Sequence, residues 1–298
     1  MENLIKRIGM TVMLLLLGAC TAVTETTRIE SENQNSRVRF VILHYTSEDF
    51  AESLRLLTLR TDRPVSSHYL VPEPNDATYT EKTLRVFQLV DESQRAWHAG
   101  RSYWRGKTGL NDQSIGIEIV NTGHCRLPDD GHNDVSAASS SLCFFPDYPE
   151  SQLALVVELL QDILERHPDI PVTHVIGHSD IAPGRKIDPG PRFPWQRLYQ
   201  LGIGAWYDED TVFKYWTQFQ TEPPSLSMVQ QALELYGYKV ADTGELDEAT
   251  ADVLQSFQLH FRPEVVNRRP DIKTAAILFA LIEKYYPREL DALLNDAE

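Results

Sequence analysis

Between residues 37 and 204 the sequence alternates short strand-like runs with amphipathic helical patterns, and this alternation restricts the fold. Isoleucines at every second position of 114–120 share one face, whereas Gly116 and Glu118 lie on the other. Apolar residues of 150–166 recur at helical spacing instead. The pattern predicts an α/β fold with a mixed central sheet flanked by helices. Strands are expected at 38–43, 67–71, 86–90, 114–120 and 172–176, and the segment 95–98 is expected to pair with them. Helices are expected at 46–60, with Thr46 or Ser47 as the cap, and at 150–166.

The chain changes in composition after Gly204, and a length of 298 residues favours two domains. Pro223-Pro224 marks a boundary, and 205–222 is interpreted as a linker. The segment 223–290 is then expected to form a small three-helix domain. Its three helical patterns run over 225–236, 247–261 and 271–286, of which the last two open with a capping aspartate.

Residues 1–19 have the composition of a signal peptide. Lys6 and Arg7 precede an apolar run over 8–17, which is too short to span a bilayer. A signal of this kind directs the chain out of the cytoplasm, so it is excluded from the folded part.

The residues at 17–20 resemble a bacterial lipobox, in which Cys20 is the lipidation site. A plain secretory signal with Cys20 incidental is the alternative. Thr21 stands where an inner-membrane retention signal would have aspartate. We therefore expect a protein lipid-anchored on the periplasmic side of the outer membrane, with the polar segment 20–36 as a flexible tether.

Charge and cysteine content narrow the partners and the compartment. The net charge of −15 argues against a nucleic-acid partner, which requires a basic face. If Cys20 is lipidated, Cys125 and Cys143 remain as a pair, and a compartment outside the cytoplasm permits a disulfide between them. Two free thiols are the alternative.

Two histidines and an aspartate follow strand-like segments in positions suited to a metal. His44 ends the first strand, His178 follows another, and Asp188 lies ten residues later in a loop rich in proline and glycine. Three protein ligands of this kind suit a catalytic zinc ion that keeps one position open for water. Taken alone, such a trio is more often a set of scattered core or surface residues.

Glu118 and Lys186 are candidates for the chemistry around that ion. Glu118 lies inside an isoleucine-rich strand but faces away from the isoleucines, so it can point into a cleft and act as an acid/base. Lys186 lies two residues before Asp188 and can stabilise an oxyanion, a role for which Arg185 competes. The alternatives are an exposed glutamate on an edge strand and a solvated lysine.

Five motifs together resemble the N-acetylmuramoyl-L-alanine amidase 2 family, which has the fold of the peptidoglycan recognition proteins. The resemblance covers about residues 37–204 and is carried by FVILHYT (40–46), SSHYLV (66–71), AWHAG (96–100), NDQSIGIE (111–118) and GHSDIAPGRKIDPG (177–190).

The resemblance implies hydrolysis of the amide bond between N-acetylmuramic acid and L-alanine in peptidoglycan, including anhydro-muropeptides. It implies one zinc ion per chain on His44, His178 and Asp188, whose bound water attacks the lactyl carbonyl. It further implies Glu118 as acid/base and Lys186 as the transition-state stabiliser. Trp97 and His98 stand where relatives line the substrate groove, whereas His68 and His174 are expected to serve packing or hydrogen bonding.

The C-terminal segment resembles the three-helix peptidoglycan-binding domain, although short helical modules share such patterns through core packing alone. Three other functions remain open on the residues. The chain could bind cell wall without cutting it, link the outer membrane to the wall, or cut within the stem peptide as a zinc peptidase. The intact set of ligands and Glu118 favour the amidase.

Overall fold

The computed structural model describes residues 26–123 and 145–295. The chain divides into two units between residues 35 and 36. The described part of the first unit, 26–35, forms no helix or strand. Across the described ranges, no helix has both the length and the apolar character needed to cross a membrane.

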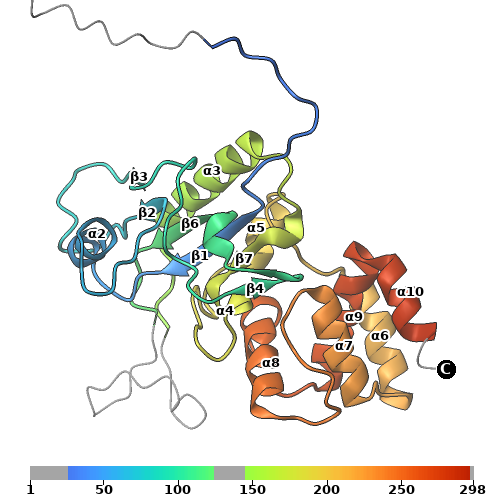
Figure 1. The fold of residues 1–298 in the computed structure, drawn as a ribbon. Coiled ribbons are helices and arrows are strands. Elements are labelled where there is room, and N and C mark those ends of the chain that lie inside the picture. The colour runs from blue at the N-terminus through green and yellow to red at the C-terminus, as the bar shows by residue number, and fades with distance from the viewer. Residues whose placement is uncertain (1–25, 124–144, 296–298) are drawn as a thin grey trace, which may run out of the picture. The chain divides into compact units, whose positions relative to one another are not determined.

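A five-stranded mixed sheet forms the centre of the second unit, as the sequence predicts (Figure 1). Its order is β3-β2-β6-β1-β7, with β1, β2, β6 and β7 in parallel pairs and β3 antiparallel to β2. The parallel core therefore directs the carboxyl ends of its strands to one edge. The strands are β1 (Phe40–Tyr45), β2 (Tyr69–Val71), β3 (Phe87–Gln88), β6 (Ser114–Ile119) and β7 (Val175–Gly177).

Helix α3 (Glu150–Arg166) covers the sheet with the apolar stripe expected from its sequence. Leu153, Val156, Leu160 and Ile163 are buried on that stripe. A smaller core cluster, which includes Phe50 and Leu57, lies under helix α2 (Phe50–Thr58). Short helices follow at η1 (Leu110–Asp112), η3 (Val172–His174), α4 (His178–Ile181) and α5 (Trp195–Gln200).

Two element boundaries differ from the prediction for a local reason. Helix α2 begins at Phe50 rather than at 46, because Asp49 is the cap and accepts from the amide of Glu52 at 2.9 Å. Ser47 has a φ of 61°, which places it in a turn before the helix. The expected strand at 172–176 starts with the 3-10 turn η3, so only its end joins the sheet.

A small separate hairpin follows the segment 95–98, which is itself not a strand. Strands β4 (Tyr103–Trp104) and β5 (Lys107–Thr108) pair through a two-residue turn. Arg105 and Gly106 both have positive φ, at 43° and 76°, as the tight turns of hairpins require.

The C-terminal segment contains the three predicted helices. They are α7 (Leu226–Tyr236), α8 (Glu248–Phe261) and α9 (Ile272–Tyr285), and Ser225, Asp247 and Asp271 each accept a backbone hydrogen bond as their caps. The helix that follows, α10, spans Pro287–Asn295. Helix α9 is buried along most of its length, which makes it the centre of this region.

The segment 205–222, expected to be a linker, is mostly helical. Helix α6 (Glu209–Thr221) buries Tyr215 and Phe219 against Phe279 of α9, with ring centroids 5.6 and 5.1 Å apart. These two aromatic residues are four positions apart, so one helical face carries both. The proline pair ends α6 but does not separate it from the helices beyond.

A candidate metal centre at the carboxyl edge of the sheet

The strand register brings the predicted catalytic residues to one edge of the sheet. His44 in β1 lies directly opposite Glu118 in β6, and partners in a parallel pair point to the same face. His178 follows β7, which pairs with the other side of β1. The carboxyl ends of three neighbouring strands thus contribute His44, Glu118 and His178.

The three expected ligands converge at this edge. The Nδ1 atoms of His44 and His178 lie 2.9 Å apart, and each lies 3.0 Å from Oδ2 of Asp188. All three side chains are buried, and they form the group of histidine and carboxylate residues able to hold a metal within the described ranges. The structure therefore supports the predicted set His44, His178 and Asp188.

The second ring nitrogen of His178 lies between an acceptor and a donor. Nε2 is 3.3 Å from the carbonyl oxygen of Ala99, which can only accept a hydrogen bond, and 3.5 Å from Nη2 of Arg185, which can only donate one. The contact with Ala99 is the shorter of the two. A proton on Nε2 leaves Nδ1 with a lone pair directed at His44 and Asp188.

A longer chain of hydrogen bonds leads to the same result for His44. The Ser114 hydroxyl donates to the carbonyl oxygen of Leu110 at 2.7 Å, so Ser114 accepts from Nε2 of His98 at 3.1 Å. Nδ1 of His98 then carries a lone pair and accepts from Nε2 of His44 at 3.0 Å. Nδ1 of His44 is left without a proton.

This arrangement suits a cation. Two ring nitrogens and a carboxylate oxygen lie within 3.0 Å of one another. With the second nitrogen of each ring donating to its outer acceptor, all three atoms direct lone pairs at a common point, where a positive ion stabilises them. The three atoms lie close enough together for all of them to reach one metal ion. Metal-binding histidines commonly donate their other ring nitrogen to an acceptor, as both do here.

His98 lies below the ligands rather than in an open groove. Only 8% of the residue is exposed, and its ring lies against Gly116 so closely that a Cβ there would stand 2.5 Å from the ring. The structure thus assigns His98 a contact with His44, which differs from the expected place on the groove wall. Its neighbour Trp97 is 51% exposed and remains available to a ligand.

Burial and neighbouring charges shift the pKa values of the acidic groups in opposite directions. Burial raises the pKa of Glu118 to about 8, Asp188 adds to this, and Lys186 opposes it. Burial would also raise the pKa of Asp188, but the neighbouring rings of His178 and His44 hold it well below its usual range. One carboxyl therefore retains a proton near neutral pH while the other is ionised.

The two basic candidates of the loop differ in their contacts. The Lys186 side chain is exposed, and its charge acts on both Glu118 and His44. Arg185 donates to the carbonyl oxygens of Ala99 at 3.0 Å and Arg101 at 2.8 Å. Arg185 thus holds the backbone beside His178, and Lys186 remains free to act on a substrate.

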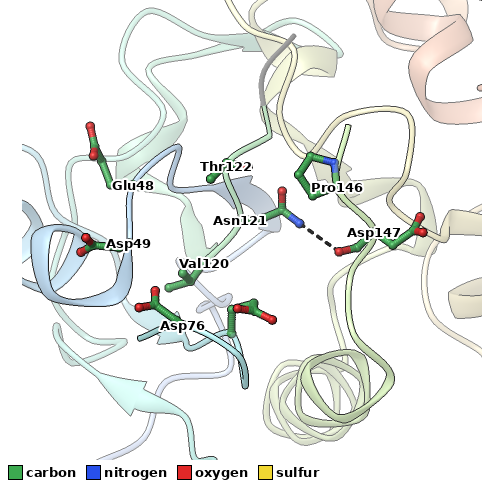
Figure 2. A pocket seen from close by; sticks show the side chains of 9 residues that line it. Glu48, Asp49, Asp76, Val120, Asn121, Thr122, Pro146 and Asp147 are labelled. Atoms are coloured by element: carbon green, nitrogen blue, oxygen red, sulfur yellow. Dashed lines mark hydrogen bonds between the residues drawn. The ribbon is translucent and has the colours of Figure 1, made fainter. Parts of the chain in front are cut away.

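A separate acidic cavity of about 370 Å³ lies beside the end of β6 (Figure 2). None of the three candidate ligands lines it, so the cavity is distinct from the metal site. Asp49 and Asp76 in its wall already accept backbone hydrogen bonds from helix α2. The residues that line it are Glu48, Asp49, Glu73, Asp76, Val120, Asn121, Thr122, Pro146 and Asp147.

Sequence reasoning did not assign roles to Ser114 or to the carbonyl of Ala99. Ser114 has a usable signal, because strand alternation places it on the face of His44. The carbonyl group of Ala99 has no such signal in the sequence, because every residue carries a backbone carbonyl. The predicted lipidation site Cys20 and the predicted disulfide pair Cys125 and Cys143 lie outside the described residues.

Comparison with known families matches both parts of the chain. The family described as N-acetylmuramoyl-L-alanine amidase matches residues 34–191, and a peptidoglycan binding domain family matches residues 222–278. N-acetylmuramoyl-L-alanine amidase AmiD of Escherichia coli is 41% identical over 260 residues, which are 87% of this chain and 87% of the relative.

Solved structures agree with these matches. AmpDh3 from Pseudomonas aeruginosa superposes with a TM-score of 0.78 at 44% identity, covering 88% of this chain and 98% of that one. The complex of AmiD from Escherichia coli with an anhydro-N-acetylmuramic acid peptide gives 0.72 at 40% identity, covering 87% and 94%. The resemblance read from the motifs and the predicted α/β fold are thereby confirmed. The chain belongs to the N-acetylmuramoyl-L-alanine amidase family and is an amidase of that kind with a C-terminal peptidoglycan-binding domain.

Proposed function

We propose that this amidase uses zinc to hydrolyse the bond between N-acetylmuramic acid and L-alanine, in peptidoglycan and in anhydro-muropeptides. The observation that carries the proposal is the convergence of three buried ligand atoms, from His44, His178 and Asp188, next to Glu118. Two nitrogens and one carboxylate oxygen are a donor set that zinc prefers, and zinc would supply Lewis acidity and a nucleophile at neutral pH.

Glu118 is the proposed acid/base. A carboxyl with a pKa raised to about 8 can hold a proton near neutral pH. The charge of Lys186 already lowers this value, and a cation held by the neighbouring ligands would lower it further toward the working pH, where a group exchanges protons best. Glu118 thus removes a proton from the attacking water and returns it to the leaving nitrogen of L-alanine.

Lys186 is the proposed partner of the developing oxyanion. Lys186 is exposed in the loop that carries Asp188, its charge lowers the pKa of Glu118, and no carboxylate in the described residues forms an ion pair with it. An unpaired cation near the reacting carbonyl stabilises negative charge that appears only in the transition state.

The substrate class follows from the solved relatives. AmpDh3 was solved with an anhydromuramic pentapeptide, and AmiD of Escherichia coli with anhydro-N-acetylmuramic acid-L-Ala-D-γ-Glu-L-Lys. Since each covers most of this chain at 40% identity or more, we propose the same class of muropeptide here. The exposed ring of Trp97 is a candidate contact for it.

We also propose that Cys20 carries the lipid anchor and that the enzyme acts at the periplasmic side of the outer membrane. The apolar run before Cys20 supports the proposal. Fractionation of cells that express wild type and Cys20→Ser tests it, because the variant should leave the membrane fraction and wild type should not.

The reaction is tested by mass spectrometry of products from purified muropeptides, with and without a chelator. The proposal predicts a free stem peptide that begins with L-alanine, lost on chelation, restored by zinc and lost in Glu118→Ala. Cleavage inside the stem would indicate a peptidase, and binding to sacculi without any product would indicate a binding module. Release that resists both chelation and Glu118→Ala would contradict the scheme.

A further inference from the structure

A buried carboxylate outside the ligand set joins the metal site to the C-terminal helices. Asp180 lies in α4, two residues after His178, and 1% of it is exposed. It accepts three hydrogen bonds, from the amide of Gly177 at 2.8 Å, the hydroxyl of Tyr238 at 2.6 Å and Nδ1 of His260 at 2.8 Å. Two of these three donors belong to the C-terminal region.

Each of the two donors is itself held in place by aromatic packing. The His260 ring stacks on Trp195 with centroids 3.9 Å apart, and Tyr238 packs against Trp104 at 4.9 Å. Both Tyr238 and His260 are buried. Both donors are therefore held in place by packing that does not involve Asp180. Asp180 depends on these donors, because a buried charge without hydrogen-bond partners is strongly unfavourable.

Asp180 in turn fixes the backbone that carries two ligands. Its carboxylate binds the amide just before His178, and the neighbouring amide of Ser179 donates to the carbonyl oxygen of Asp188 at 2.9 Å. Gly177 also lies against the ring of Pro189, since a Cβ there would stand 2.7 Å from its Cδ. A displacement of Asp180 would thus move both His178 and Asp188.

Helix α8 contacts the ligand loop at a second point. A Cβ at Gly184, where φ is +70°, would collide with the carboxylate of Asp252. Asp252 is itself held by Arg268, which donates to it at 2.8 Å. The loop between His178 and Asp188 is therefore supported by α8 at both of these positions.

We propose that the C-terminal region positions the metal ligands through Tyr238 and His260, which act on His178 and Asp188 by way of Asp180. This inference rests on the proposed zinc-dependent function. It gives the region a task within the active site, separate from any binding of cell wall. Tyr238 and His260 are positioning residues, because neither touches the reacting atoms.

The test compares two tyrosine variants of the full-length protein. Tyr238→Phe removes the hydroxyl that donates to Asp180, whereas Tyr236→Phe removes a hydroxyl from the same buried aromatic cluster and leaves all three donors to Asp180 in place. Zinc affinity is measured by competition with a chromophoric chelator. Loss of a hydrogen-bond partner that orients a metal ligand typically lowers metal affinity about 10–100-fold. We expect a loss of about 10-fold in zinc affinity for Tyr238→Phe and no change for Tyr236→Phe.

A second pair separates hydrogen bonding from packing at His260. His260→Asn keeps a donor near the position of Nδ1, whereas His260→Phe keeps the ring that stacks on Trp195. We expect the asparagine variant to retain most of the zinc affinity and the phenylalanine variant to lose it. The absorption spectrum of the cobalt-substituted protein should change in the same order, since it reports the geometry at the ligands.

The outcomes distinguish this inference from the function on which it rests. If the wild-type protein binds no zinc, the proposed function fails. If wild type binds zinc but Tyr238→Phe and His260→Phe, folded by circular dichroism, bind it equally tightly with an unchanged cobalt spectrum, the positioning role is wrong. Should Tyr238→Phe not fold, the His260 pair still decides the question.

Discussion

The hydrogen-bond chain below His44 makes a specific prediction for His98→Phe. Phenylalanine keeps the ring that lies on Gly116 but removes both nitrogens, so the Nε2 proton of His44 loses its acceptor. In the metal-free variant the proton can move to Nδ1, where Asp188 accepts it at 3.0 Å. Metal binding requires a bare Nδ1 and forces the proton back to Nε2, where it is buried without a partner.

The magnitude follows from that single unsatisfied group. A buried donor without an acceptor costs about 1–3 kcal/mol, and the metal-bound state alone carries this cost. At about 1.4 kcal/mol for each tenfold change, zinc affinity should fall about 5-fold to about 140-fold.

The assay is competition with a chelator, supported by nitrogen chemical shifts that report the tautomer of His44. Ser114→Ala should weaken binding in the same direction, because His98 loses the acceptor that fixes its own tautomer. Ser67→Ala is the control, since this buried hydroxyl has no partner among the described residues. Unchanged affinity in both His98→Phe and Ser114→Ala would refute the reasoning.

Three further predictions follow from the site. Glu118→Gln should lower kcat/KM by about 10²–10⁴-fold while zinc affinity stays within a few-fold of wild type, and near-normal turnover would remove Glu118 from the mechanism. Trp97→Ala should raise KM about tenfold through lost ring contact and leave the melting temperature unchanged, which steady-state kinetics and calorimetry can check. Burial lowers the pKa of His174 from 6.5 to about 4, so its unfolded form takes up a proton first as the pH falls. The stability that neutral His174 contributes is present above about pH 6.5 and is lost toward pH 4. The melting temperature of His174→Phe should therefore fall less steeply with pH over that range than that of wild type, and equal slopes for the two proteins would contradict this.

The ends of the strands indicated two of the three candidate ligands, and the motifs shared with the family implied the third, Asp188. His44 closes a run of apolar residues and His178 follows another, and parallel strands bring such ends to one edge. The alternation around Glu118 likewise predicted its face, which the register with His44 supports. These positions depend on local periodicity, which a single sequence carries.

The parts that were not predicted depend on contacts between distant residues. The change in composition after Gly204 and the proline pair at 223–224 predict a linker over 205–222. The contact of Tyr215 and Phe219 with Phe279, which makes α6 part of the helical region, joins residues far apart in the sequence. The bonds from Tyr238 and His260 to Asp180 span 58 and 80 residues, and no local pattern indicates them. Sequence periodicity therefore predicts helices and strands better than it predicts which of them pack against one another.

The packing of α6 on α9 also bears on how such proteins can be recombined. The family match for the C-terminal domain starts at residue 222, yet the aromatic residues that cover Phe279 lie before that point. A chimera joined at residue 222 would expose Phe279 to water. A junction before Glu209 would transfer α6 together with the surface of α9 on which it packs. The portable unit of this architecture thus begins one helix before its sequence signature, and it also extends past residue 278 to include the end of α9 and α10.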